Sequence, residues 1–263
     1  MGLEPNTDIR LVALLPFSMA AIFLFLSVIT TCFIINDQKF HDNILVTYLL
    51  SCFVLTAFFL SRGILFAIPE SRIEEDNKII LLVDRLIRSL PLLAVVINIS
   101  FVRFFLKKQV ETWDKWFYYL VVGVTVFLTF VTLTTDEVLI TPITPTGEFG
   151  VARSTDVESL SGFLYFPVGV ISMLWILWEF LHYFRHRLSS GDRTPNWKPT
   201  ILLFGYLALF LGTGYEVYYL WFTSAGKDVP LYEIITMDVG GFIFVLLTTY
   251  VIIDYRLTVL RQD

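Results

Sequence analysis

Ten ionisable side chains lie inside long apolar stretches of this sequence. A charged group in lipid is costly, so such residues are paired, face a polar cavity or serve a function. An arginine can also bind an anionic or carboxylate ligand through two parallel hydrogen bonds, which makes a pair of arginines a candidate ligand site. The ten residues are Arg62, Asp84, Arg85, Arg88, Arg103, Glu179, Glu216, Glu233, Asp238 and Asp254.

Seven apolar stretches must position these residues, and each is long enough to cross a bilayer as a helix, which takes about 20 mostly apolar residues. They lack the apolar/polar alternation of barrel strands, and only a helix or a closed barrel satisfies its backbone in lipid. The stretches are about 11–35, 44–68, 79–106, 116–135, 160–184, 199–222 and 231–256. With loops too short for a second domain, the sequence predicts an all-α integral membrane protein in which residues 1–263 form one seven-transmembrane-helix bundle.

Lysine and arginine are distributed unevenly between the segments that connect these stretches. The connections after the first, third and fifth stretches and the C-terminal segment hold ten, whereas the N-terminal segment and the other connections hold five. Because basic residues concentrate on the cytoplasmic side, we expect the N-terminus outside and the C-terminus in the cytoplasm. No basic patch is large enough to indicate a nucleic-acid partner. The expected partner of the apolar helices is the lipid bilayer.

Seven of the ten charges fall near the outer boundary in this orientation, each within roughly 15 Å of it. We name these seven the outer polar layer: Arg62, Asp84, Arg85, Arg88, Glu216, Glu233 and Asp238. The other three, Arg103, Glu179 and Asp254, lie near the inner ends, where long side chains snorkel to the interface or form interfacial salt bridges.

Three interpretations of the outer polar layer remain open, and the first two are compatible. The layer is an ion-pair network that holds the helices in register, or a polar pocket open to the outside in which arginines bind an anionic ligand. The third interpretation is that the side chains snorkel to the interface without contacting one another. Arg85 and Arg88, three positions apart, share a helix face. The candidate ligand-binding residues are Arg62, Asp84, Arg85, Arg88, Tyr215, Glu216, Tyr219 and Asp238.

The outer connection after the fourth stretch has the pattern of a short β-hairpin. Pro142, Pro145 and Gly147 punctuate extended residues, which predicts a turn near Thr146–Gly147; the alternative is a solvated connector. Glycines in the last two stretches are expected to permit close helix approach. They are Gly212, Gly214, Gly240 and Gly241.

Several motifs that would indicate another function are missing. The last stretch has no lysine that could bind retinal. His182 and His186 are four positions apart but have no glutamate between them in the metalloprotease pattern, so we interpret them as part of a basic end of a helix. The sequence thus predicts no metal site, no cofactor and no enzymatic activity.

The C-terminal third carries a family resemblance. KPTILLFGYLALFLGTGYEVYYLW, followed after a short loop by VGGFIFVLLTTYVIIDYRLTVL, resembles the last two helices of the bacterial histidine kinase N-terminal seven-transmembrane sensor family. Tyr250–Ile253 and Tyr255–Leu257 match the family's Tyr-Ala-Ile-x-x-Tyr-Arg-Leu-like ending with Val251 in place of alanine, and TPTGEFGV is similar to its outer hairpin. The family's later Pro-Gly-Pro is replaced here by SLSGFLY.

The resemblance implies a multi-pass sensor domain in the bacterial cytoplasmic (inner) membrane, expected to form a homodimer. Family members usually continue into a kinase or cyclase domain, so the expectation here is a separate cytoplasmic signalling partner or an output domain missing from this sequence. Asp254, Tyr255 and Arg256 would form the signal-transmitting exit of the last helix.

The leading hypothesis is therefore a receptor that binds an unidentified small extracytoplasmic ligand in the outer polar layer and transmits the signal through its last helix. The alternative is a transporter or channel that uses the same charges as a pathway. The mid-membrane segments Leu92–Val96 and Phe242–Leu247 are apolar, which argues against a charged pathway. An integral membrane enzyme ranks third, because no catalytic motif is present.

Overall fold

The computed structural model of the chain describes residues 5–36, 42–67, 78–106, 112–135, 144–145, 151–152, 160–189, 197–222 and 236–260. Seven long helices account for nearly all of these residues. They are α1 (Pro5–Asn36), α2 (Asn43–Ala67), α3 (Lys78–Phe105), α4 (Thr112–Thr134), α5 (Leu160–Ser189), α6 (Trp197–Phe222) and α8 (Thr236–Leu260). The described part of the chain is thus an all-helical bundle, as predicted.

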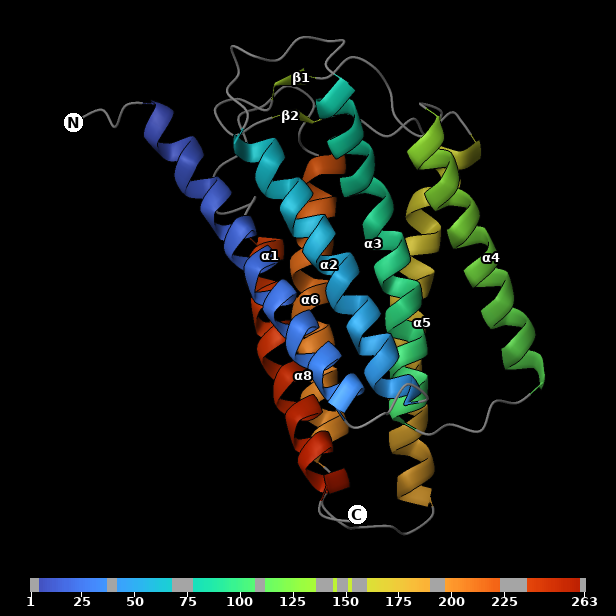
Figure 1. Ribbon diagram of the computed structural model, residues 1–263. Helices are drawn as coiled ribbons and strands as arrows, with labels where there is room; N and C mark the ends of the chain where they lie inside the picture. Colours follow the sequence, from blue (N-terminus) through green and yellow to red (C-terminus); the bar gives the residue numbers. More distant parts are fainter. Residues whose placement is uncertain are drawn as a thin grey trace.

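The helices lie side by side along one axis (Figure 1). We name the end where α1 begins and α2 ends the N-end of the bundle, and the end where α2 begins and α8 ends the C-end. Helix α2 packs between α1 and α3, and α8 packs on α6 and also contacts α1. Helix α4 lies at the periphery against α3 and α5, and it leans away from α5 toward the C-end (Figure 1).

Six of the described helices contain segments long and apolar enough to cross a membrane. These segments are Ala13–Asn36, Asn43–Leu65, Leu81–Phe105, Lys115–Thr134, Pro167–Ser189 and Thr236–Tyr255. Large apolar side chains on their outer faces are exposed, including Phe25, Phe130 and Leu188. Apolar surface of this extent is typical of contact with lipid rather than with water. The architecture is that of a multi-pass membrane protein, and the predicted count of seven spans stays a prediction for α6.

Many polar side chains, by contrast, are buried inside the bundle. Small hydroxyl residues fit between closely packed helices. Because lipid offers no water as a hydrogen-bond partner, their hydroxyl groups donate to backbone carbonyls of their own helix. The hydroxyl of Ser27 donates to the Phe23 carbonyl at 2.8 Å, and that of Thr248 donates to the Phe244 carbonyl at 2.8 Å. Aromatic rings fill the space between the helices, with Phe23 of α1 stacked on Phe59 of α2 at 5.6 Å between ring centroids.

Two glycines allow α6 and α8 to approach closely. A Cβ atom added to Gly212 would lie 2.5 Å from the Thr236 carbonyl oxygen, and one added to Gly240 would lie 2.5 Å from that of Ala208. Gly241 faces α2, where an added Cβ would lie 2.9 Å from Phe59. The predicted close approach is confirmed at these three glycines. It is wrong at Gly214, because an added Cβ there meets no described atom within 4 Å.

Helix ends and the outer connection differ in detail from the sequence-based expectations. Helix α5 continues to Ser189 rather than 184, so the basic residues around His186 lie on the helix. The short strands β1 (Thr144–Pro145) and β2 (Val151–Ala152) pair antiparallel, with Thr144 opposite Ala152. The turn predicted at 146–147 lies outside the described residues, so the hairpin stays a prediction.

Candidate functional site

Arg62 and Asp238, both from the outer polar layer, meet as a buried ion pair near the N-end. Arg62 comes from α2 and Asp238 from the first turn of α8, where a carboxylate is favoured by the helix dipole. The Arg62 Nε atom lies 3.4 Å from Asp238 Oδ1, and the two side chains are 6% and 1% exposed. An ion pair buried to this degree depends on both partners, because removing either takes a counter-charge away from the other in apolar surroundings.

The structure describes only some of the other candidate ligand-binding residues and of the outer polar layer. Arg85 of α3 turns toward α4 and donates from Nη1 to the Leu133 carbonyl at 3.3 Å, in the last turn of that helix. A cation there satisfies a carbonyl that has no partner within its own helix. Arg88 is half-buried, and Tyr215 is 45% exposed on the same face as Leu211, one turn away. Nothing is described for Glu233 or for the side chains of Asp84, Glu216 and Tyr219.

A neutral polar cluster in the interior was not predicted. The Tyr206 hydroxyl of α6 donates to Asn98 Oδ1 of α3 at 2.7 Å, and Asn98 Nδ2 donates to the Ser51 hydroxyl of α2 at 3.1 Å. Asn98 Nδ2 also donates to its own helix at Ala94. The cluster joins three helices. The signal in the sequence that could have revealed it is an asparagine inside an apolar stretch, because such a residue bonds across helices in lipid.

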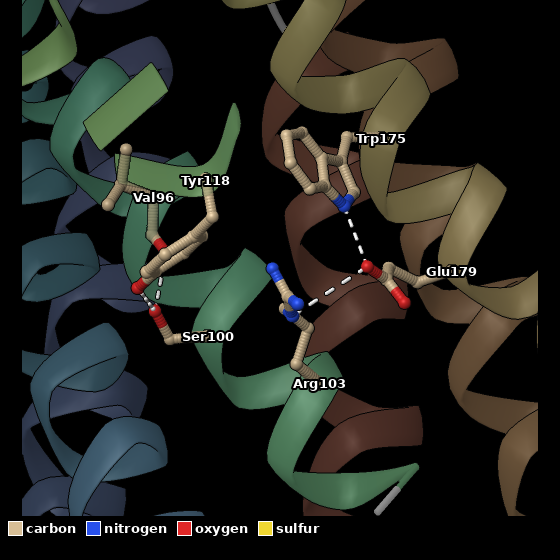
Figure 2. Close-up of polar contacts among 6 residues, drawn as sticks. All are labelled: Val96, Ser100, Arg103, Tyr118, Trp175 and Glu179. Carbon is tan, nitrogen blue, oxygen red and sulfur yellow. Dashed lines mark hydrogen bonds and ion pairs between the residues drawn. The ribbon is translucent and has the colours of Figure 1, made fainter. Parts of the chain in front are cut away.

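A second buried ion pair joins α3 to α5 toward the C-end (Figure 2). Arg103 Nε lies 3.8 Å from Glu179 Oε1, and the side chains are 7% and 0% exposed. Trp175, one turn before Glu179, donates from Nε1 to the same oxygen at 2.7 Å. The Arg103 guanidinium also lies over two rings, 5.1 Å from that of Tyr118 and 5.7 Å from that of Trp175. Both charges were predicted near the inner ends of their helices, and here they form a buried pair.

Polar contacts at the C-end tie α8 to two other helices. Lys198 Nζ of α6 lies 2.6 Å from Asp254 Oδ2 of α8. The Tyr255 hydroxyl donates to Asp42 Oδ2 at 3.3 Å. Asp42 also caps α2, accepting from the Ile44 amide at 3.0 Å. Two of the three residues predicted to transmit a signal therefore contact neighbouring helices, and the Arg256 side chain lies outside the described residues.

Apolar side chains separate the Arg62–Asp238 pair from the Asn98 cluster. On α2, Arg62 follows Ser51 by eleven positions, a rise of about 16 Å along the helix. The buried residues at this level include Leu55, Phe58, Phe59, Leu92 and Phe244. Large apolar side chains therefore lie between the two polar levels.

Among the residues described, no group of three or more histidine, cysteine, aspartate or glutamate side chains could hold a metal ion. No protein-family model, curated protein or solved structure matches the chain. The resemblance to seven-transmembrane sensor domains of histidine kinases therefore stays a hypothesis that depends on the short motifs of the sequence.

Proposed function

We propose that this chain is a membrane receptor that binds a small extracytoplasmic ligand in the outer polar layer. Helix α8 would pass the signal to a cytoplasmic kinase or nucleotide cyclase, with the chain acting as a homodimer. The observation that carries the proposal is that α8 is bonded to other helices at both of its ends. Asp238 pairs with Arg62, and sixteen residues later, a rise of about 24 Å, Asp254 pairs with Lys198.

The buried pair at the N-end suits a ligand that competes for one of its members. A ligand carboxylate that took Arg62 as its partner would leave Asp238 without its counter-charge and favour a different position of α8. Helix α8 could shift against α6 because Gly212 and Gly240 present only backbone at the contact. Such a shift of α8 would change the positions of Asp254 and Tyr255 at its other end. Signalling requires only that the ligand bind one position of α8 more tightly than the other.

The alternative is a transporter or channel that uses the buried charges as a pathway. The apolar level around Phe58, Phe59 and Phe244 favours the receptor, because a charged solute would have to cross it without a polar partner. Flux of protons or small anions through liposomes that contain the purified protein would overturn the receptor proposal in favour of transport.

Electron spin resonance can test whether the two ends of α8 are coupled. Spin labels on the exposed positions Ile253 of α8 and Leu181 of α5 report the position of α8 near the C-end. Cys32 and Cys52 would first be replaced by alanine. Asp238→Asn, which breaks the pair at the other end, is expected to shift or broaden the distance distribution between the labels.

The matched control is Leu246→Ala, which changes a lipid-facing side chain of the same helix and should leave the distances unchanged. If D238N stays folded and gives the same distribution as the control, α8 does not couple its two ends and the proposal fails.

A further inference from the structure

The guanidinium group of Arg103 is buried but incompletely bonded. Its Nη1 and Nη2 atoms have no hydrogen-bond partner among the described residues, and only its Nε atom faces Glu179, at 3.8 Å. A buried donor without an acceptor costs about 1–3 kcal/mol, and more when it is charged. An acceptor from outside the chain would remove this cost.

The surroundings of these two nitrogens suit an anion. Figure 2 shows the guanidinium pointing between Tyr118 of α4 and Trp175 of α5. Trp175 is itself held by Glu179 and by Phe117, whose ring stacks on it at 4.5 Å. Glu179 uses the Nε side of the guanidinium, so the Nη side is left for two parallel hydrogen bonds to a second anion.

Among the residues that the structure describes, Tyr118 in the first turns of α4 lies over this guanidinium. From Lys115 to Leu120 every side chain is exposed except Tyr118, which is half-buried and bonded to the Ser100 hydroxyl at 2.5 Å. Helix α4 also leans away from α5 in this region (Figure 1). A small displacement of Tyr118 would therefore open the Nη atoms to the surrounding lipid.

The depth of Arg103 matches that of a phosphate group. Arg103 lies two residues before the end of α3, about 3 Å along the helix axis, at the end of the apolar segment Leu81–Phe105. In a bilayer crossed by this segment, Arg103 would lie near the level of the lipid headgroups. The sequence continues with Lys107 and Lys108, and Lys115 follows in α4. Basic residues at a membrane surface attract anionic lipids and soluble anions alike.

We propose that Arg103, between Tyr118 and Trp175, binds a phosphate group, supplied either by an anionic lipid headgroup or by soluble phosphate. The site lies on α3, α4 and α5, apart from the Arg62–Asp238 pair. The phosphate proposal can therefore be tested independently of the receptor proposal.

The test measures thermal unfolding of the full chain in lipid nanodiscs. One arm compares phosphatidylcholine alone with phosphatidylcholine that contains phosphatidylglycerol, and the other adds inorganic phosphate at constant ionic strength. R103Q/E179Q removes both charges together, so no lone charge stays buried. Its control is Leu246→Ala, which changes a lipid-facing side chain of α8 outside both buried pairs.

Wild type and the control are expected to gain stability in one of the two arms, and R103Q/E179Q should lose that gain or need about tenfold more anion to reach it. A gain from phosphatidylglycerol identifies the lipid as the source, and a gain from inorganic phosphate identifies the soluble anion. E179Q, which keeps Arg103 but removes its competing carboxylate, should respond at lower anion concentration than wild type. Equal responses of wild type, E179Q and R103Q/E179Q would overturn the proposal.

Discussion

At the scale of single residues, this protein combines buried charges with an interior of mostly apolar side chains and a few neutral polar ones. Arg62–Asp238 and Arg103–Glu179 both join helices that are distant in sequence, and all four side chains are less than 10% exposed. Removing ions from water is expensive, so such pairs add little net stability but strongly disfavour any arrangement that separates them. Each pair therefore specifies which helices meet, and at what depth.

The Arg62–Asp238 pair should behave as a unit under mutation. Arg62→Gln and Asp238→Asn each leave one buried charge without its partner, and each is expected to cost about 3–5 kcal/mol of unfolding free energy. The double variant should cost clearly less than the sum of the two. Reversible unfolding in mixed micelles would measure all three, with Leu60→Ala on the exposed face of α2 as a control expected within about 0.5 kcal/mol of wild type. Additive losses would contradict a direct pairing.

At the scale of elements, the contact between α6 and α8 is the closest helix approach that the glycines reveal. Gly212 and Gly240 place backbone against backbone, and the added-Cβ position of Gly240 lies 3.4 Å from the Gly212 Cα atom. Packing of this kind is how helices associate in lipid, where no hydrophobic force drives them together. The same contact sets where Asp238 lies relative to Arg62.

Alanine at these glycines tests the contact. Gly212→Ala and Gly240→Ala would each bring a methyl group to within 2.5 Å of a carbonyl oxygen, so both are expected to destabilise the protein by about 1–3 kcal/mol. Gly214→Ala is the matched control on α6 and should be neutral or stabilising by up to about 1 kcal/mol, because alanine favours the helix. Thermal unfolding in detergent would rank the three. A loss at Gly214 equal to that at Gly212 would contradict the packing argument.

At the scale of the whole molecule, the orientation in the membrane decides which polar level faces the outside. The distribution of lysine and arginine predicts that the C-end of the bundle lies in the cytoplasm, together with Asp42, Lys198 and Asp254. A receptor needs this orientation, because its ligand must reach Arg62 and its output must meet the end of α8.

Reporter fusions would check the orientation. Green fluorescent protein joined after Asp263 should fluoresce, because it folds in the cytoplasm, and alkaline phosphatase joined there should stay inactive. The same two reporters joined after Pro69, in the connection between α2 and α3, should give the opposite result. Fluorescence at both positions would mean an even number of crossings between them and would exclude the predicted arrangement.

The sequence by itself determined the helical membrane architecture and the approximate depth of each charge. Every span must supply about 20 apolar residues of its own, so the position of each helix in the sequence can be predicted without knowing which helices pack against it. Depth follows from counting residues along each helix, which is why Arg62 and Asp238 could be assigned to one layer, and Arg103 and Glu179 to another.

Only the tertiary structure decided which charges pair and which polar residues reach across helices. Counting residues along a helix gives the depth of a side chain but neither the direction in which it points nor the helix that it meets. The sequence therefore did not show that Arg62 pairs with Asp238 while Arg85 bonds to α4. The Asn98 cluster stayed hidden for a related reason. Most hydroxyl side chains in these helices bond to their own backbone, as Thr248 does, and only packing reveals that Tyr206 and Ser51 converge on one asparagine.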